Sequence, residues 1–347
     1  MRRLGLLAEA KVTTHLPVLP EPRGSAMAQR GRAARALCRF LTLVSTATFA
    51  AEVQGVIASS PPAGQDSSSA SGQAVTVSVS VLSKTNTPLP DLTENEFRVL
   101  VDDREQSIHR VLKKRSQRFR VGLLVDISGS QLGGRGRADW EEVSTLFGLV
   151  LGKGDLGFVA AFDDRVKMMC DVTGNLSELE TATKLVLRAS PRGGTALYDA
   201  ISDQCRDQFW KTEESKALVI ITDGEDNASH EKLESAVKAA QRADVVIYSI
   251  VPPAPELPFG FRRVGKSSEE TARRISADTG GLFLPAKKPG DIRGAIDRIA
   301  ENLMNLYAIS FYPQAVPRNG KFHKVKVVST RSGVRLSAQP GYYAPDK

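Results

Sequence analysis

A strict alternation of apolar and polar residues begins at Ala74. From there to Val81, a valine stands at every second position, with Thr or Ser between them. This period of two is typical of a β-strand with one buried face. Two further strands are predicted at 97–101 and 108–112, on either side of the turn signal Asp102–Asp103. The block is too short to form a complete β-sandwich, so we expect it to need more strands.

The middle of the chain alternates short apolar runs with amphipathic segments. Continuous apolar runs at 121–125 and 217–221 are typical of strands buried on both faces. Other strands are expected at 156–162, 166–170, 245–250 and 282–284, and helices at 140–151, 176–187, 197–210, 231–242, 269–278 and 291–306. This order predicts an α/β fold for residues 120–306, with a doubly wound, mainly parallel sheet and helices on both faces.

The last forty residues return to strand-like patterns, at 307–312, 324–329 and 334–338. We expect this C-terminal β segment, residues 307–347, to pack with the N-terminal β segment, residues 74–119. The two would form one small β-sandwich that flanks the α/β domain inserted between them.

The N-terminal region has the pattern of an export signal. A basic stretch from Arg30 to Arg39 precedes an apolar run at 40–50, and Thr48 and Ala50 are small residues suited to cleavage after Ala50. The apolar run is shorter than the roughly 20 residues that a membrane-spanning helix needs. Residues 1–50 are therefore predicted to be a secretory signal peptide, and the protein to be exported to the periplasm or the extracellular space. An uncleaved signal that anchors the chain in a membrane is the alternative.

Two features surround this signal. Met27 begins a leader of ordinary proportions, so residues 1–26 are predicted to come from a misassigned start. After the signal, residues 51–73 contain a tract rich in Ser, Pro and Gly at 59–72. Such a composition buries too little apolar surface to offset the entropy of ordering, and it predicts a flexible linker.

The net charge of the chain, +8, comes mostly from the leader. The whole chain has 47 Lys and Arg against 39 Asp and Glu, of which residues 1–50 hold eight and two. The remainder has 39 against 37, so it is nearly neutral and does not favour nucleic acid as a partner. The small cluster Lys113–Arg115 is expected to be a solvated strand end. Three Cys and four His in 347 residues exclude a disulfide-dense scaffold or a Cys-rich zinc module.

Three loops carry oxygen-bearing side chains where strands end or helices begin. The first has Asp126, Ser128 and Ser130, the second has Thr195, and the third has Asp223. Ligands of open parallel sheets bind beyond the carboxyl ends of the strands, where these loops are expected to meet. Two carboxylates and three hydroxyls form a hard oxygen set, which suits Mg²⁺, Ca²⁺ or Mn²⁺ better than zinc.

The spacing Asp126-x-Ser128-x-Ser130, with Thr195 and Asp223, resembles the metal-ion-dependent adhesion site (MIDAS) of von Willebrand factor A (VWA) domains. The flanking segments, PLPDLTENEFRVLVDD and YAISFYP followed by GKFHKVKVV and GYYAP, resemble the VWFA-related proteins typical of Acidobacteria. The resemblance covers about residues 74–345. It implies a Rossmann-like VWA fold for the α/β domain, with these five residues as metal ligands.

The resemblance also implies a function. In the family, an Asp or Glu carboxylate from a partner protein completes the coordination of the cation, which makes the domain a protein-binding module and not an enzyme. A metal-dependent hydrolase using Asp126 and Asp223 is the alternative. It is disfavoured because the chain lacks a phosphate-binding P-loop and a nucleophile elbow, and no His lies in the three loops.

Several other residues carry open alternatives. Glu225 and Asp226 either shape the rim of the site or serve as solvated loop or N-cap residues for the helix at 231. Cys170 and Cys205 either pair or remain free thiols. The Pro-rich loop from Pro252 to Ser268, with Phe259 and Phe261, either contributes to partner selection or is a variable surface insertion.

The leader generates a direct prediction about the mature protein. Cleavage after Ala50 should leave Ala51 as the first residue, and mass spectrometry of the exported protein should find that N-terminal peptide. A mature N-terminus upstream of residue 51 would contradict the cleavage site. Peptides from residues 1–26 in the precursor would contradict a start at Met27.

Overall fold

The computed structural model describes residues 74–84, 89, 91–129, 141–189, 193–252, 266–288, 290–314 and 319–344. All of them belong to one compact unit, residues 65–347. The predicted signal peptide, the predicted linker and the part of the Pro-rich loop that contains Phe259 and Phe261 lie outside the described residues. None of the helices in the described ranges is long and apolar enough to cross a membrane.

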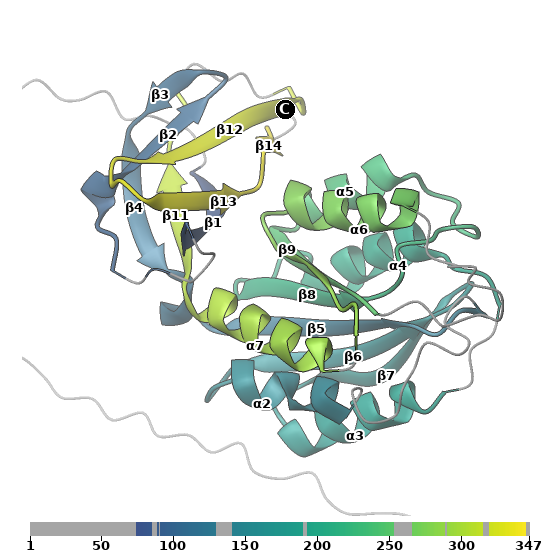
Figure 1. Ribbon diagram of the computed structural model, residues 1–347. Coiled ribbons are helices and arrows are strands. Elements are labelled where there is room, and N and C mark those ends of the chain that lie inside the picture. Colours follow the sequence, from purple (N-terminus) through teal and green to yellow (C-terminus); the bar gives the residue numbers. More distant parts are fainter. Residues whose placement is uncertain are drawn as a thin grey trace, which may run out of the picture. The chain divides into compact units, whose positions relative to one another are not determined.

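A six-stranded sheet forms the centre of the α/β domain (Figure 1). Its order is β10-β9-β8-β5-β6-β7, and every neighbouring pair is parallel except β6 and β7. The strands are β5 (Phe119–Asp126), β6 (Leu156–Phe162), β7 (Val166–Thr173), β8 (Ser215–Ile221), β9 (Val245–Val251) and β10 (Phe283–Pro285). The predicted α/β fold with a mainly parallel sheet is confirmed.

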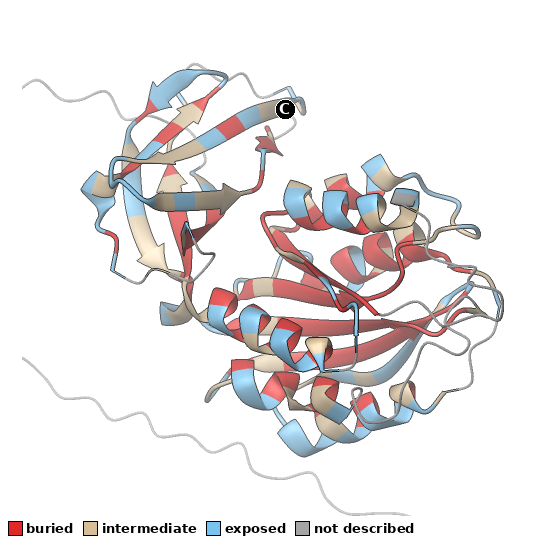
Figure 2. Cartoon of the chain, viewed as in Figure 1, coloured by how far each residue is buried: buried red, intermediate tan, exposed pale blue. Residues whose placement is uncertain are grey.

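Helices cover both faces of this sheet (Figure 1). They are α2 (Leu146–Val150), α3 (Leu176–Leu187), α4 (Leu197–Gln204), α5 (Leu233–Arg242), α6 (Lys266–Asp278) and α7 (Asp291–Met304). Leu123 and Val125 of β5 pack in one apolar cluster with α2, α3 and α7, whereas Leu124 packs in a second cluster with α4 and α5. Both faces of β5 are therefore buried (Figure 2), which explains its uninterrupted apolar run.

Two predicted helices differ in type over part of their length. Residues 141–145 form a 3-10 helix ahead of α2, where the hydroxyls of Ser144 and Thr145 donate to the carbonyls three residues earlier. Those bonds favour the tighter turn. The helix that begins at Leu197 continues as a π-helical turn, Cys205–Phe209. Cys205 on this turn is buried and Cys170 lies on β7, and both are free thiols.

Two four-stranded antiparallel sheets flank the α/β domain. One has the order β13-β1-β11-β4 and the other β14-β12-β2-β3. The strands are β1 (Val75–Ser83), β2 (Phe97–Val101), β3 (Arg104–Gln106), β4 (Ile108–Lys113), β11 (Leu306–Phe311), β12 (Phe322–Ser329), β13 (Val334–Ala338) and β14 (Gly341–Tyr343). The two sheets share one apolar cluster. The expected flanking antiparallel sheets, built from N- and C-terminal strands, are confirmed.

β3 and β14 are absent from the sequence-based prediction. Each has three residues, too few to show a period of two, and β3 is the polar sequence Arg-Glu-Gln. β3 instead depends on its turn, because Asp102 and Asp103 both have positive φ and reverse the chain onto β2.

The expectation of a solvated strand end at Lys113–Arg115 is wrong for Lys114. The Lys114 side chain is only 2% exposed, and its Nζ lies 3.7 Å from Asp244 Oδ2. Asp244 follows α5 and lies 130 residues after Lys114 in the sequence. Its carboxylate compensates the charge of the buried lysine.

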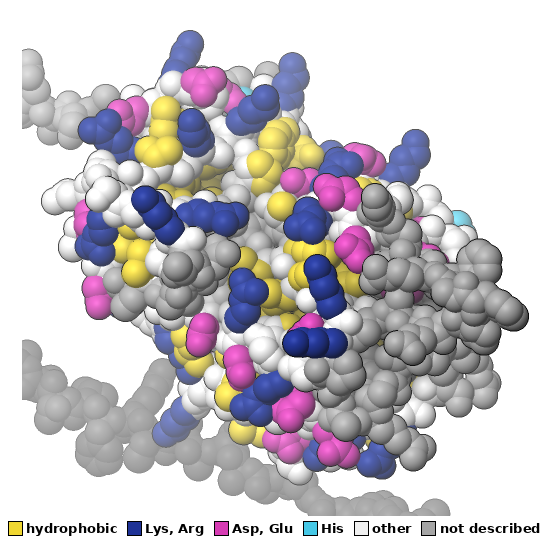
Figure 3. Space-filling model, viewed as in Figure 1, with side chains coloured by type: hydrophobic (Ala, Val, Ile, Leu, Met, Phe, Trp, Pro, Cys, Tyr) yellow, Lys and Arg dark blue, Asp and Glu magenta, His cyan; other side chains and the backbone are white. Residues whose placement is uncertain are grey.

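Across the face visible in Figure 3, basic and acidic side chains are interspersed.

A buried amide joins β1 to the α/β domain. Asn302 on α7 accepts hydrogen bonds through its Oδ1 from the hydroxyls of Ser80 on β1, at 3.0 Å, and Tyr248 on β9, at 2.7 Å. All three side chains are almost fully buried. One acceptor therefore satisfies two hydroxyls that water cannot reach.

Asn302→Ala should destabilise the protein by about 2–4 kcal/mol, because it leaves both hydroxyls buried without an acceptor. Urea unfolding followed by tryptophan fluorescence measures the loss. Asn305→Ala, three residues along, is the matched control: its side chain donates to the Glu301 carbonyl in an exposed setting, and its loss should stay within about 0.5 kcal/mol. Equal losses in the two variants would contradict the role given to the buried amide.

Candidate metal centre

The candidate ligands lie at the carboxyl edge of the central sheet. β5 and β8 are adjacent and parallel, with Val125 opposite Ile221. Asp126 is the last residue of β5, and Asp223 stands two residues beyond the end of β8. Thr195 stands two residues ahead of α4. The structure thus brings these loops to one edge of the sheet, as predicted, and Ser130 lies outside the described residues.

Hydrogen bonds connect the three loops pairwise. The Thr222 hydroxyl donates to Asp126 Oδ2 at 2.7 Å, which joins the third loop to the first. The Gly129 amide donates to the Gly193 carbonyl at 3.2 Å, which joins the first to the second. The Thr195 amide donates to the Asn227 side chain at 2.8 Å, which joins the second to the third. The predicted ligands therefore belong to one connected assembly.

Asp126 is a buried carboxyl, with 1% of its surface exposed. Burial raises its pKa from 3.8 to about 6, and the nearby charge of Asp223 acts in the same direction. Hydrogen bonds from Ser128 and Thr222 oppose the rise but do not cancel it. The charged form of Asp126 is therefore under-compensated by the protein, and a cation at this position would supply the missing charge.

Thr195 provides an independent sign of a missing partner. Its side chain is fully buried, and its Oγ1 has no hydrogen-bond partner among the residues that the structure describes. Buried hydroxyls in folded proteins are nearly always bonded, and an exception calls for an ion or a water. A cation coordinated by the Thr195 hydroxyl would satisfy this oxygen, and in the connected loops it would also add positive charge near Asp126. The residues present therefore fit a divalent cation.

The donor set is made of oxygen only. Asp126, Ser128, Thr195 and Asp223 are all at most 4% exposed, and they offer two carboxylates and two hydroxyls. Within the described ranges, no group of three or more His, Cys, Asp or Glu is arranged to hold a metal. A site with two carboxylates and several hydroxyls suits a hard cation that retains water or accepts an outside oxygen ligand.

Two neighbours of the ligands were not assigned a role from the sequence. Thr222 holds Asp126, and Asn227 holds Thr195. For Thr222 the sequence did carry a signal of a role at the site, because this residue stands between a buried strand and Asp223. No local signal pointed to Asn227, because its partner lies 32 residues earlier.

Asp226, for which the sequence left several roles open, acts as a helix cap, but for α4 and not for the helix at 231. Its Oδ2 accepts from the amide of Tyr198 at 3.1 Å and from the hydroxyl of Ser229 at 2.6 Å. Tyr198 is the second residue of α4, so Asp226 satisfies a free amide at the start of that helix instead of capping α5.

No protein-family model matches the chain, and no curated protein matches it. Among solved structures, a von Willebrand factor type A protein from Catenulispora acidiphila is 13% identical with a TM-score of 0.45, over 76% of this chain and 75% of that one. An aerotolerance-related membrane protein from Bacteroides fragilis is 18% identical with a TM-score of 0.43, over 53% and 98%.

A third structure, proximal thread matrix protein 1 from the mussel byssus with a zinc-occupied MIDAS motif, is 14% identical with a TM-score of 0.44, over 58% of this chain and 49% of that one. VWA domain proteins thus stand among the structural neighbours of the chain. These likenesses are distant, and the case for a cation rests on Asp126 and Thr195.

The raised pKa of Asp126 generates a pH-dependent prediction for the metal-free protein. A folded pKa of about 6 against an unfolded value of 3.8 means that the folded state binds the extra proton. The stability that this provides is present below pH 3.8 and is lost as the pH rises through 6. The loss amounts to about 3 kcal/mol.

Asp126→Asn removes this titration while keeping the shape of the side chain. In the presence of a chelator, the variant should gain stability relative to the natural protein between pH 4 and 7, reaching a constant advantage of about 3 kcal/mol at higher pH. Denaturant unfolding at each pH gives the difference. A difference that did not change with pH would contradict the buried, under-compensated carboxylate.

Proposed function

We propose that this chain is an exported protein-binding module whose binding depends on a divalent cation. The observation that carries the proposal is the buried Thr195 hydroxyl, which has no hydrogen-bond partner within the described ranges and lies in a loop bonded to those of Asp126 and Asp223. In the proposal Asp126, Ser128, Thr195 and Asp223 hold the cation, and Ser130 is the fifth ligand. Mg²⁺ is the proposed ion, with Ca²⁺ and Mn²⁺ as alternatives.

The proposed partner is a protein that supplies an Asp or Glu carboxylate. Two carboxylates and three hydroxyls are five ligands, so an ion of coordination number six keeps one position open for a further oxygen. A carboxylate from outside is the hard, charged ligand that such an ion prefers. Binding would then require the cation, the carboxylate and a matching protein surface together.

The alternative is a metal-dependent hydrolase that uses Asp126 and Asp223. Such an enzyme needs a general acid or base beside the cation, and His is the side chain that most often fills this role. His230, in the loop that follows Asp223, has a side chain that is 95% exposed and bonded to Asp199. These contacts favour binding over catalysis.

The proposed location follows from the leader. We propose export to the periplasm or the extracellular space, with membrane attachment only if the signal is not cleaved. Nucleic acid is not a proposed partner, since the chain beyond residue 50 is nearly neutral.

Thr195→Ala should weaken cation binding at least tenfold, because it deletes a ligand. Replacing a residue that only supports a metal ligand already lowers metal affinity roughly tenfold. Isothermal titration calorimetry with Mg²⁺ and Mn²⁺ measures the affinity. Thr183→Ala is the matched control, since Thr183 is equally buried but its hydroxyl already donates to the Leu179 carbonyl. The control should lose stability and keep its cation affinity.

Partner binding is tested with the same variants. Cell-envelope proteins captured in Mg²⁺ should be released by a chelator, and Asp126→Ala should capture none while remaining folded. Capture that persists in chelator and in Asp126→Ala would overturn the proposed mechanism. Equal loss of cation affinity in Thr195→Ala and Thr183→Ala would remove Thr195 from the site.

A further inference from the structure

We infer that Asn227 is a positioning residue for the proposed cation site: it clamps Thr195 from both sides, so that Thr195 and Asp223 form one rigid half of the site. The inference rests on the proposed function and adds a residue, and a source of preorganisation, that the ligand motif does not contain. Asn227 lies four residues beyond Asp223, in the loop between β8 and α5.

The clamp holds the two peptide groups that flank Thr195. The Thr195 amide donates to Asn227 Oδ1 at 2.8 Å. The Thr195 carbonyl accepts from the amides of Asn227, at 3.0 Å, and Ala228, at 3.1 Å. With both peptide groups held, the backbone of Thr195 cannot rotate. A β-branched side chain has few χ1 rotamers on a fixed backbone, so the clamp also limits where Oγ1 can point.

Close approach of the two loops leaves no room for other arrangements. A Cβ on Gly194 would lie 2.9 Å from Asn227 Oδ1 and 3.0 Å from the Cβ of Ala228. Gly193 enters the loop with a φ of +69°, in the left-handed region that favours glycine. The two glycines therefore let the chain reach the amide of Asn227, and a larger residue at 194 would push the clamp open.

The same loop also fastens the start of α4. Ser229 Oγ accepts from the amides of Tyr198 and Asp199, each at 3.1 Å. In return, Asp199 accepts from the amides of His230 and Glu231, each at 2.9 Å. The segment before and within α4 thus cannot shift without the loop that carries Asp223.

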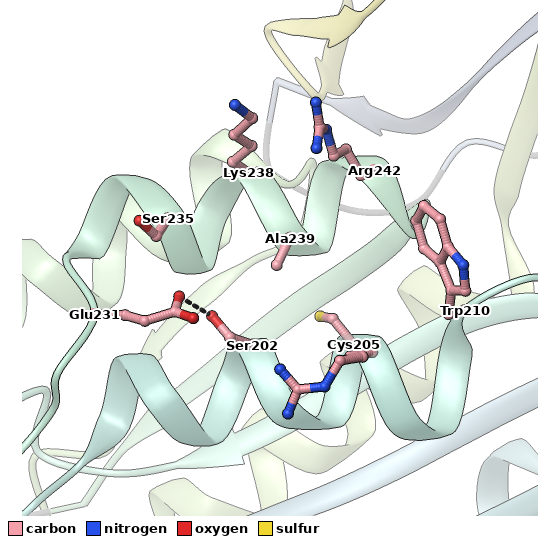
Figure 4. A pocket seen from close by; sticks show the side chains of 9 residues that line it. Ser202, Cys205, Trp210, Glu231, Ser235, Lys238, Ala239 and Arg242 are labelled. Atoms are coloured by element: carbon pink, nitrogen blue, oxygen red, sulfur yellow. Dashed lines mark hydrogen bonds between the residues drawn. The ribbon is translucent and has the colours of Figure 1, made fainter. Parts of the chain in front are cut away.

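One turn further along α4, a second contact joins the helix to the same loop. It lies in the wall of a pocket of about 450 Å³ between α4 and α5 (Figure 4). There Ser202 on α4 donates to Glu231 at 2.7 Å, and the two side chains point toward each other across the gap. The attachment of α4 to the loop therefore extends over two turns of the helix. Thr195, just ahead of α4, keeps a constant position relative to Asp223.

Asn227 acts through Thr195 and not as a ligand. Its Oδ1, the atom that a cation would use, is committed to the Thr195 amide. The residue itself is exposed, so its replacement creates no cavity. Asn227→Ala removes the hydrogen bond to the Thr195 amide and leaves the two backbone bonds to the Thr195 carbonyl. The peptide group ahead of Thr195 is then released, so Thr195 should sample other conformations, and the apparent affinity for a cation falls with the fraction that is binding-competent.

A double-mutant cycle tests this with Mn²⁺ titrated into the full chain. Asn227→Ala alone should weaken Mn²⁺ binding roughly tenfold, the size expected for a residue that supports a ligand. Asn227→Asp keeps the oxygen acceptor and should retain binding. In the background of Thr195→Ala, adding Asn227→Ala should cost less than twofold, because the ligand that Asn227 positions is already gone. Fully additive losses would overturn the inference.

A second measurement needs no metal. Hydrogen exchange of the Thr195 amide in chelator should become at least tenfold faster in Asn227→Ala, and should stay slow in Asn227→Asp. The matched control is Asn175→Ala: Asn175 is also exposed and also accepts from a backbone amide, that of Ser177. It follows β7, whose last residue pairs with the start of β6 at the opposite edge of the sheet. Neither Mn²⁺ affinity nor Thr195 exchange should change in that variant.

The two measurements separate the inference from the proposed function. If the natural protein binds Mn²⁺ and Asn227→Ala binds it equally well, the clamp has no role and the proposed function stands. If the natural protein binds no Mn²⁺ while Thr195 exchange responds to Asn227→Ala, the clamp exists but the proposed function fails, and with it the role of Asn227 toward a cation.

Discussion

A carboxylate buried at the end of the central strand is the constraint on which the candidate site depends. β5 lies between β6 and β8 and pairs with both along its length. The carboxylate of Asp126, at the end of β5, is therefore buried in the interior and shielded from water. The protein supplies hydrogen bonds from Ser128 and Thr222, yet the pKa of Asp126 is still raised to about 6. Burial therefore disfavours the ionised form relative to water, and a cation beside Asp126 would stabilise that form.

The rest of the α/β domain explains why these loops can be held so closely. Apolar residues on both faces of β5 and β8 pack under helices on two sides, which sets the positions of the strand ends. Hydrogen bonds between loops then act over short distances, from Gly129 to Gly193 and from Thr195 to Asn227. A rigid scaffold with polar loops at one edge is the usual arrangement for binding sites on open sheets.

The motif spacing predicted which residues would share an edge, because adjacent parallel strands place their carboxyl ends together. Asp126, Ser128 and Asp223 needed only that rule and their residue types, whereas Thr195, which stands ahead of a helix, needed the resemblance to the adhesion-site motif. Thr222 and Asn227 needed knowledge of which loops touch, since their partners lie 96 and 32 residues away. For Asp226 the sequence left a rim residue, a solvated loop residue and a cap of the helix at 231 as alternatives, and the structure shows it capping α4 instead.

Local periodicity in the sequence determined the identity of most strands and helices, and their alternation determined the mainly parallel sheet. The residue types alone determined that the candidate ligands are all oxygen atoms. Only the tertiary structure decided which strands became neighbours: β1 lies between β11 and β13, more than 220 residues later. It also decided that Lys114 is buried against Asp244 and that Asn227 clamps Thr195. The physical reason is that hydrophobic period and residue type are properties of a short segment. Burial of a charge and the partner of a hydrogen bond depend instead on distant segments meeting.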